Sequence, residues 1–152
     1  MAKIRVTKEF KFEMAHALWN YDGACKNIHG HSYKLFVTVI GEPINDISKP
    51  KNGMVIDFGD LKRIVNSSIV DKFDHAVVFS SNADTKNLPL SNQMFEKYEV
   101  LDFQPTCELM VADFAERIKP MLPTNIKLFS LKLHETATSY AEWFASDNNV
   151  LI

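Results

Sequence analysis

Two histidines separated by one glycine begin a stretch that has the composition of a β-strand, His29-Gly30-His31-Ser-Tyr-Lys-Leu-Phe-Val-Thr-Val-Ile. The stretch is rich in β-branched and aromatic residues, which favour strands. Because side chains alternate between the two faces of a strand, His29 and His31 point the same way. They share that face with Tyr33, Leu35, Val37 and Val39. This spacing places two imidazoles where they can bind one metal ion.

A third histidine, His16, ends another predicted strand over residues 3–16. Apart from Lys8, the even positions of this strand are apolar: Ile4, Val6, Phe10, Phe12 and Met14. Apolar faces rarely carry imidazoles without partners. A zinc site with three histidines and an open fourth position accounts for all three, and an open position is typical of catalytic zinc. The alternative is that each is a core histidine bonded to the backbone.

Length and composition limit the class of protein. A chain of 152 residues favours one domain, residues 1–152, with a substantial core. The net charge of −2, with no block of like charge, argues against nucleic-acid binding and against binding to anionic membranes. Two cysteines, Cys25 and Cys107, do not form a disulfide framework, which fits a reducing cytoplasm. No apolar run has transmembrane length, and the N-terminus lacks a signal-peptide core.

The middle of the chain predicts one helix and several loops. Residues 17–28 form a loop that brings Cys25 toward the histidines, and connections of this length are often functional. A helix over residues 60–70 follows from the spacing of its apolar residues, with Asp57 or Asp60 as its cap and no catalytic role for either. Residues 80–99 lack a clear period and are predicted to be loop, with at most a short helix.

A second helix begins after Pro105. Thr106 is its predicted N-cap, and Glu108 lies in the first turn, where negative charge is favoured. Ordinary capping explains both residues as well as ligand binding does. The predicted apolar stripe consists of Leu109, Ala112, Ala115, Ile118 and Leu122.

Two further strands, over residues 126–135 and 139–144, are predicted at the end of the chain. Glu135 continues the apolar face formed by Phe129, Leu131 and Leu133, whereas His134 lies on the other face and is not expected to be a ligand. A carboxylate in such a position needs a cationic or hydrogen-donating partner, either in a salt bridge or on a bound ligand.

The adjacent Asp74 and His75 admit two interpretations. The carboxylate can orient the imidazole for acid–base chemistry. Alternatively, the two residues form a solvated turn with diverging side chains.

The predicted element order is β-β-α-α-β-β. It indicates an α+β fold with an antiparallel four-stranded sheet and two helices on one face. The two exposed edges of such a sheet favour joining subunits edge to edge, and a closed ring is the natural solution.

Several motifs, in order along almost the whole chain, resemble the 6-pyruvoyltetrahydropterin synthase family. The three-residue spacing between Cys25 and His29 is similar to the bacterial 6-carboxytetrahydropterin synthase branch, which serves deazapurine (queuosine) synthesis. One departure is Phe79 followed by Ser80, where the family commonly has Leu-Asn. The motifs are Phe12-x-x-Ala15-His16, Cys25-x-x-x-His29-Gly30-His31-Ser-Tyr, Gly53-Met-Val-Ile-Asp-Phe-Gly-Asp-Leu-Lys62, Asp74-His75, Pro105-Thr106-x-Glu108 and Glu135-Thr136-x-Thr138-Ser139.

The resemblance implies a role for each matched residue. His16, His29 and His31 would hold zinc. Cys25 would be the general base, and Asp74 with His75 would form the acid–base pair. Glu135 would anchor the pterin, and Thr106 and Glu108 would line its pocket.

The resemblance also implies the T-fold, a trimer stacked into a hexamer, and sites between subunits. The implied substrate is 7,8-dihydroneopterin triphosphate, which would yield 6-carboxy-5,6,7,8-tetrahydropterin, acetaldehyde and triphosphate. Zinc on the side-chain oxygens would act as a Lewis acid. Three alternatives stay open: the biopterin-type reaction that keeps the side chain, a non-enzymatic ring protein with a structural metal, and a cupin-like oxygenase. The two helices fit the last poorly.

Overall fold

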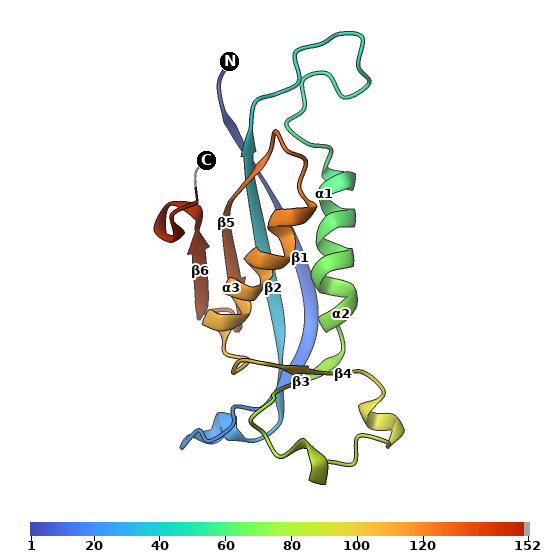
Figure 1. The fold of residues 1–152 in the computed structure, drawn as a ribbon, viewed down its shortest axis with the longest axis vertical. Helices are drawn as coiled ribbons and strands as arrows, with labels where there is room; N and C mark the ends of the chain where they lie inside the picture. Colours follow the sequence, from blue (N-terminus) through green and yellow to red (C-terminus); the bar gives the residue numbers. More distant parts are fainter. Residues whose placement is uncertain (151–152) are drawn as a thin grey trace.

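One long antiparallel hairpin forms the centre of the sheet in the computed structural model, which describes residues 1–150 (Figure 1). Strands β1 (Ile4–His16) and β2 (His29–Gly41) pair along their whole lengths, from Ile4↔Gly41 to His16↔His29. The apolar alternation predicted for both strands is confirmed, and β2 begins at His29. This register makes His16 and His29 the last residue pair of the hairpin, next to the connecting loop.

In the part of the chain that the structure describes, the sheet has six strands in the order β4-β3-β1-β2-β5-β6. The predicted antiparallel strands are present, including β5 (Lys127–His134) and β6 (Tyr140–Phe144). The predicted count of four is wrong, because β3 (Ala76–Ser80) adds parallel to β1 and β4 (Tyr98–Leu101) adds parallel to β3. These two strands have only five and four residues, too few to establish a period in the sequence.

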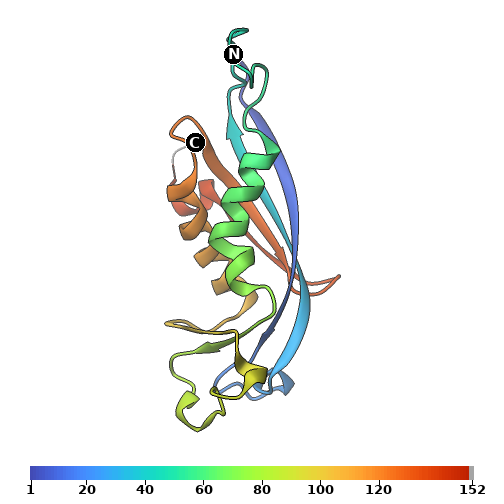
Figure 2. The ribbon, with the colours of Figure 1, turned by 90° about the vertical axis from the view of Figure 1, so that its right-hand side faces the viewer.

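The helices cover one face of the curved sheet and leave the other face open (Figure 2). Helix α1 (Phe58–Val65) continues through a π-helical turn, Asn66–Val70, into α2 (Asp71–Phe73), so the predicted helix is longer at both ends. Asp57 is its cap and accepts the Gly59 N–H at 2.6 Å. The other candidate cap, Asp60, instead pairs with Lys51 and Arg63.

Helix α3 (Cys107–Ile118) begins at the predicted cap. Thr106 Oγ1 accepts the Leu109 N–H at 3.3 Å. The predicted stripe is partly wrong, because Leu109 is 45% exposed. The predicted stripe and a second set of apolar residues both have helical spacing in α3. The second set has the bulkier side chains, and it is the one that is buried. Its members are Cys107, Met110, Val111, Phe114, Ala115 and Ile118.

The prediction that Phe129 lies on the buried face of β5 is wrong, because β5 contains a β-bulge. Thr38 pairs with Ser130 but Val39 pairs with Leu128, so Phe129 has no partner on β2. Leu128 therefore takes the buried face and Phe129 lies on the opposite one, with the Arg5 guanidinium carbon 3.7 Å from its ring centroid. Beyond the bulge, Leu131 and Leu133 are buried as predicted.

The core lies between the helices and the inner face of the sheet. The rings of Phe12 and Tyr33 stack at 5.2 Å, and Phe114 packs edge-on against Phe12 at 6.0 Å. Tyr33 in turn packs edge-on against the imidazoles of His16 and His31, so the aromatic core extends to these two histidines. None of the helices in residues 1–150 combines the length and apolarity needed to cross a membrane.

Candidate metal centre

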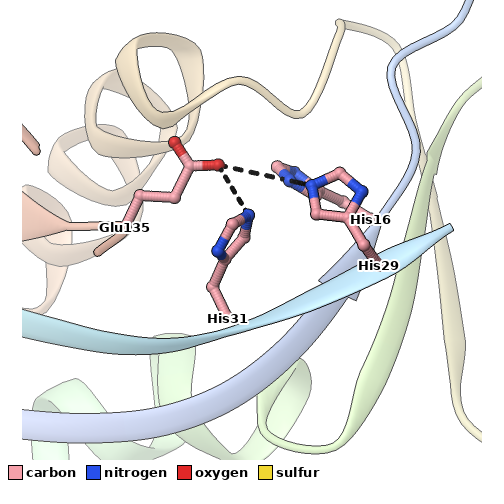
Figure 3. A group of neighbouring side chains, drawn as sticks. All are labelled: His16, His29, His31 and Glu135. Carbon is pink, nitrogen blue, oxygen red and sulfur yellow. Dashed lines mark hydrogen bonds and ion pairs between the residues drawn. The ribbon is translucent and has the colours of Figure 1, made fainter. Parts of the chain in front are cut away.

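Three imidazoles come together at the end of the β1–β2 hairpin (Figure 3). The hairpin pairs His16 with His29, and His31 lies two residues further along the same face of β2. The ring centroids of His16 and His29 are 4.6 Å apart, and that of His31 is 5.2 Å and 4.8 Å from theirs. The three histidines therefore lie together, as their spacing predicts.

Glu135 completes a four-residue group, called here the His/Glu cluster (His16, His29, His31 and Glu135). It follows the last residue of β5, and the pairing of Lys34 with His134 places it beside β2. Its Oε1 atom lies 3.3 Å from His16 Nε2 and 3.1 Å from His31 Nε2. The sequence indicates that Glu135 needs a partner, but not that the partners are these histidines.

Backbone carbonyls fix two of the imidazoles through their Nδ1 atoms. His16 Nδ1 lies 2.7 Å from the Pro105 carbonyl oxygen, and His29 Nδ1 lies 2.7 Å from that of Asn27. Each Nδ1 must donate its hydrogen to that oxygen, so in the neutral ring Nε2 carries a lone pair. This arrangement is the usual outer shell of metal-binding histidines. Sequence reasoning did not identify either carbonyl.

The cluster fits a bound cation. The Nε2 atoms of His16 and His29 are 3.1 Å apart, and two lone pairs at this distance need a proton or a metal ion between them. Within residues 1–150, His31 Nε2 is buried and makes no hydrogen bond of good geometry, and its nearest polar neighbour is Glu135 Oε1 at 3.1 Å. An orphaned ring nitrogen is costly unless it has a ligand to bind. The ligand atoms of all four residues lie within 4.8 Å of one another.

The electrostatics favour the ligand forms of His31 and Glu135. Burial lowers the pKa of His31, and the neighbouring His16 and His29 lower it further, although Glu135 acts in the opposite direction. Hydrogen bonding with His16 and the charges of the imidazoles hold the pKa of Glu135 below its usual value, despite its partial burial. A neutral imidazole and an ionised carboxylate are the forms that bind metals.

Cys25 lies in a 3-10 turn, Ala24–Lys26, within the loop that joins β1 to β2. It is a free cysteine and is partly exposed. Its carbonyl accepts the Leu18 N–H at 2.9 Å, which ties the turn to the residues just after His16. Cys25 is not one of the clustered ligands.

Asp74 and His75 lie in the turn before β3, as one of the two interpretations predicts, but their side chains meet and do not diverge. His75 Nδ1 lies 3.1 Å from Asp74 Oδ1, which also accepts the Glu13 N–H at 2.9 Å. Partial burial acts to raise the pKa of Asp74, but the bond from Glu13 and the His75 imidazole outweigh it and the pKa falls. His75 has a left-handed backbone, with φ of 62°, and its side chain is 76% exposed.

Within one chain, this pair does not join the His/Glu cluster. His75 borders a depression of about 320 Å³ that is lined by Glu13, Ala15, Gly30 and Ser32 and also by His31 of the cluster. Glu13, Ala15 and Ser32 alternate with His16 and His31 along their strands, so the side chains of these three residues lie on the opposite face of the sheet.

The remaining candidates lie at the edge of the cluster or away from it. Thr106 caps α3 and follows Pro105, whose carbonyl holds His16. Glu108 is exposed in the first turn of α3. His134 packs between the rings of Phe36 and Tyr140 and is not part of the His/Glu cluster.

Comparison with known proteins gives consistent results. A sequence model of the family described as 6-pyruvoyl tetrahydropterin synthase matches residues 5–146. The chain is 36% identical over 141 residues to a 6-carboxy-5,6,7,8-tetrahydropterin synthase from Haemophilus influenzae, covering 91% of this chain and 97% of that one.

Solved structures share the fold. An uncharacterized protein from Wolinella succinogenes superposes with a TM-score of 0.75 at 19% identity, covering 95% of this chain and 99% of that one. The 6-pyruvoyl tetrahydropterin synthase of Caenorhabditis elegans superposes with a TM-score of 0.66 at 23% identity, covering 95% and 96%.

Proposed function

The chain belongs to the 6-pyruvoyl tetrahydropterin synthase family, and from this we propose that it is a 6-carboxy-5,6,7,8-tetrahydropterin synthase. It acts on 7,8-dihydroneopterin triphosphate and releases acetaldehyde and triphosphate, in deazapurine (queuosine) synthesis in the cytoplasm. The observation that carries the proposal is the His/Glu cluster, in which the ligand atoms of three imidazoles and a carboxylate converge within 4.8 Å of one another.

His16, His29 and His31 would hold zinc, which supplies Lewis-acid activation of the substrate's side-chain oxygens when bound. Cys25, in the loop beside these histidines, would remove a proton from the side chain. A thiol accepts a proton only as its thiolate, a form that a neighbouring cation favours. Positioned acid–base groups of this kind contribute about 10²- to 10⁴-fold each to the rate.

The pterin ring would bind beside the cluster. Glu135 would accept hydrogen bonds from the amino and ring N–H groups of the pterin, with Thr106 and Glu108 lining the pocket. Asp74 and His75 would move a proton on the substrate side chain. Since neither residue belongs to the His/Glu cluster of its own chain, the pair that serves each site would come from a neighbouring copy.

This sharing supports assembly of the chain through its sheet edges into trimers stacked as a hexamer. The two edge strands, β4 and β6, present backbone groups for pairing with other copies.

Identification of all products tests the reaction. Purified zinc-loaded protein incubated with 7,8-dihydroneopterin triphosphate should yield a 6-carboxy product, acetaldehyde and triphosphate by mass spectrometry. The family description and the Caenorhabditis elegans structure favour a second candidate, the 6-pyruvoyl reaction. That reaction releases triphosphate but keeps all three side-chain carbons, so a product with an intact side chain and no acetaldehyde would favour it.

A further inference from the structure

The Glu135 carboxylate lies where a three-histidine zinc site would have its open position. In a tetrahedral zinc site with bonds of about 2.0–2.2 Å, neighbouring ligand atoms are about 3.3–3.6 Å apart. Glu135 Oε1 is 3.3 Å from His16 Nε2 and 3.1 Å from His31 Nε2. The His16 and His29 Nε2 atoms are 3.1 Å apart. These three contacts are close to the edges of such a tetrahedron, and the ligand atoms of all four residues lie within 4.8 Å of one another.

The surroundings of Glu135 leave its carboxylate dependent on the cluster. Within residues 1–150, its only close polar contacts are the two imidazoles. The side chain is 24% exposed, so most of it is shielded from water, and a shielded carboxylate whose only partners are imidazoles is stabilised by a cation. The backbone is fixed because the Glu135 N–H donates to the Ser139 carbonyl at 3.1 Å. Rotation of the side chain alone therefore decides what the carboxylate contacts.

We infer that Glu135 is the fourth metal ligand in the substrate-free enzyme and that the pterin ring of the substrate removes it from the metal. The second part rests on the proposed function, which makes the pterin amino and ring N–H groups partners of Glu135. Two donors side by side suit both oxygens of one carboxylate, as in pairs with arginine. A carboxylate that turns to meet them leaves the metal, so the fourth position opens only when a substrate ring is bound.

Metal binding and binding of the pterin ring then oppose each other through Glu135. By linkage, the factor by which the ring weakens metal binding equals the factor by which the metal weakens binding of the ring. A pterin without side-chain hydroxyls should show the mutual weakening of metal binding and ring binding most directly. Such a pterin has no side-chain oxygen that could replace the Glu135 carboxylate on the metal.

The first test measures ligation without substrate or turnover. Zinc affinity is measured by competition with a chelator, and the visible spectrum of the Co²⁺-loaded protein is recorded, for wild type and Glu135→Gln. Loss of an outer-shell partner typically weakens metal binding about 10- to 100-fold, and loss of a direct ligand should cost at least as much. The cobalt bands should also change. The matched control is Glu9→Gln, which removes the same charge from an exposed position on β1 and should change neither.

The second test adds unsubstituted pterin to the Co²⁺-loaded wild-type protein. Its binding should shift the cobalt bands as the carboxylate leaves, and metal-free protein should bind the ring more tightly than zinc-loaded protein. Cobalt bands and zinc affinity unchanged in Glu135→Gln would overturn the ligation. Bound pterin, seen by quenching of its fluorescence, with unchanged bands would overturn the displacement. Absence of any pterin binding would overturn the proposed function together with the displacement, while the first test still decides ligation.

Discussion

His16 Nε2 and His29 Nε2 lie 3.1 Å apart although each ring has committed its Nδ1 hydrogen to a backbone carbonyl. The two carbonyls come from different parts of the chain: Pro105 precedes α3, and Asn27 precedes β2. The fold therefore fixes the tautomer of both rings before any ligand arrives. An arrangement that aims two lone pairs at one point is stable when a cation occupies that point.

Removing one of these rings should remove the metal. Loss of an outer-shell partner weakens metal binding about 10- to 100-fold. We expect His29→Ala, which removes a direct ligand, to weaken zinc binding by at least as much. Metal content after dialysis and chelator competition measure this. The matched control is His134→Ala, because His134 packs against Phe36 and Tyr140 outside the cluster. Equal zinc loss in both variants would contradict the assignment.

Removing the proposed base should separate metal binding from turnover. Cys25→Ala should keep its zinc and lose about 10²- to 10⁴-fold in kcat, because a general base is lost while the ligands remain. Steady-state kinetics and metal analysis on one preparation check this. Full turnover by Cys25→Ala would reject its role.

The other cysteine provides the control. Burial raises the pKa of the Cys107 thiol to about 11, so it stays protonated at neutral pH. Its Sγ contacts the Leu133 carbonyl oxygen at 3.2 Å, a bond that serine can also make. Cys107→Ser should therefore retain turnover.

The Tyr33 hydroxyl predicts a pH-dependent change in stability. Among the described residues, 1–150, it is buried without a hydrogen-bond partner, and burial raises its pKa above the ordinary value. At pH 7, Tyr33→Phe should raise the free energy of unfolding by up to about 1 kcal/mol, because no orphaned hydroxyl remains.

Above pH of about 10 the unfolded wild-type chain releases the Tyr33 proton that the folded chain retains, so wild-type stability falls. Tyr33→Phe lacks this contribution, so its advantage should widen as the pH rises. Urea unfolding of wild type and Tyr33→Phe at pH 7 and at a pH above about 10 measures both effects. A variant that loses stability at pH 7 would show that the hydroxyl has a partner.

The position of Asp74 and His75 across the sheet predicts complementation between subunits. Cys25→Ala and His75→Ala should each be inactive alone. If each site combines Cys25 of one copy with His75 of another, random assortment in a refolded equal mixture should restore about a quarter of the sites. Activity no greater than that of the separate variants would place both residues in one chain's site.

The parts of the fold that depend on local alternation could be predicted from the sequence. His16, His29 and His31 share one face because a strand period of two leaves no other choice, and the hairpin register then brings them together. Asp57 and Thr106 could be identified as caps for a similar reason, since capping depends on residues within one turn.

The remaining features depend on contacts between distant segments. Strands β3 and β4 are too short to show a period and gain their place from parallel pairing. The bulge that turns Phe129 outward follows from the β2–β5 register. Glu135 contacts the histidines because β5 lies beside β2 in the sheet. The residues of β5 alone do not indicate which strand will lie next to it.

Anomalous diffraction at the zinc edge, from crystals of zinc-loaded protein, tests the metal centre most directly. We expect one peak per chain at about 2.0–2.1 Å from the Nε2 atoms of His16, His29 and His31. Zinc-replete crystals with no peak among these three atoms, or with a peak held by other residues, would contradict the assignment.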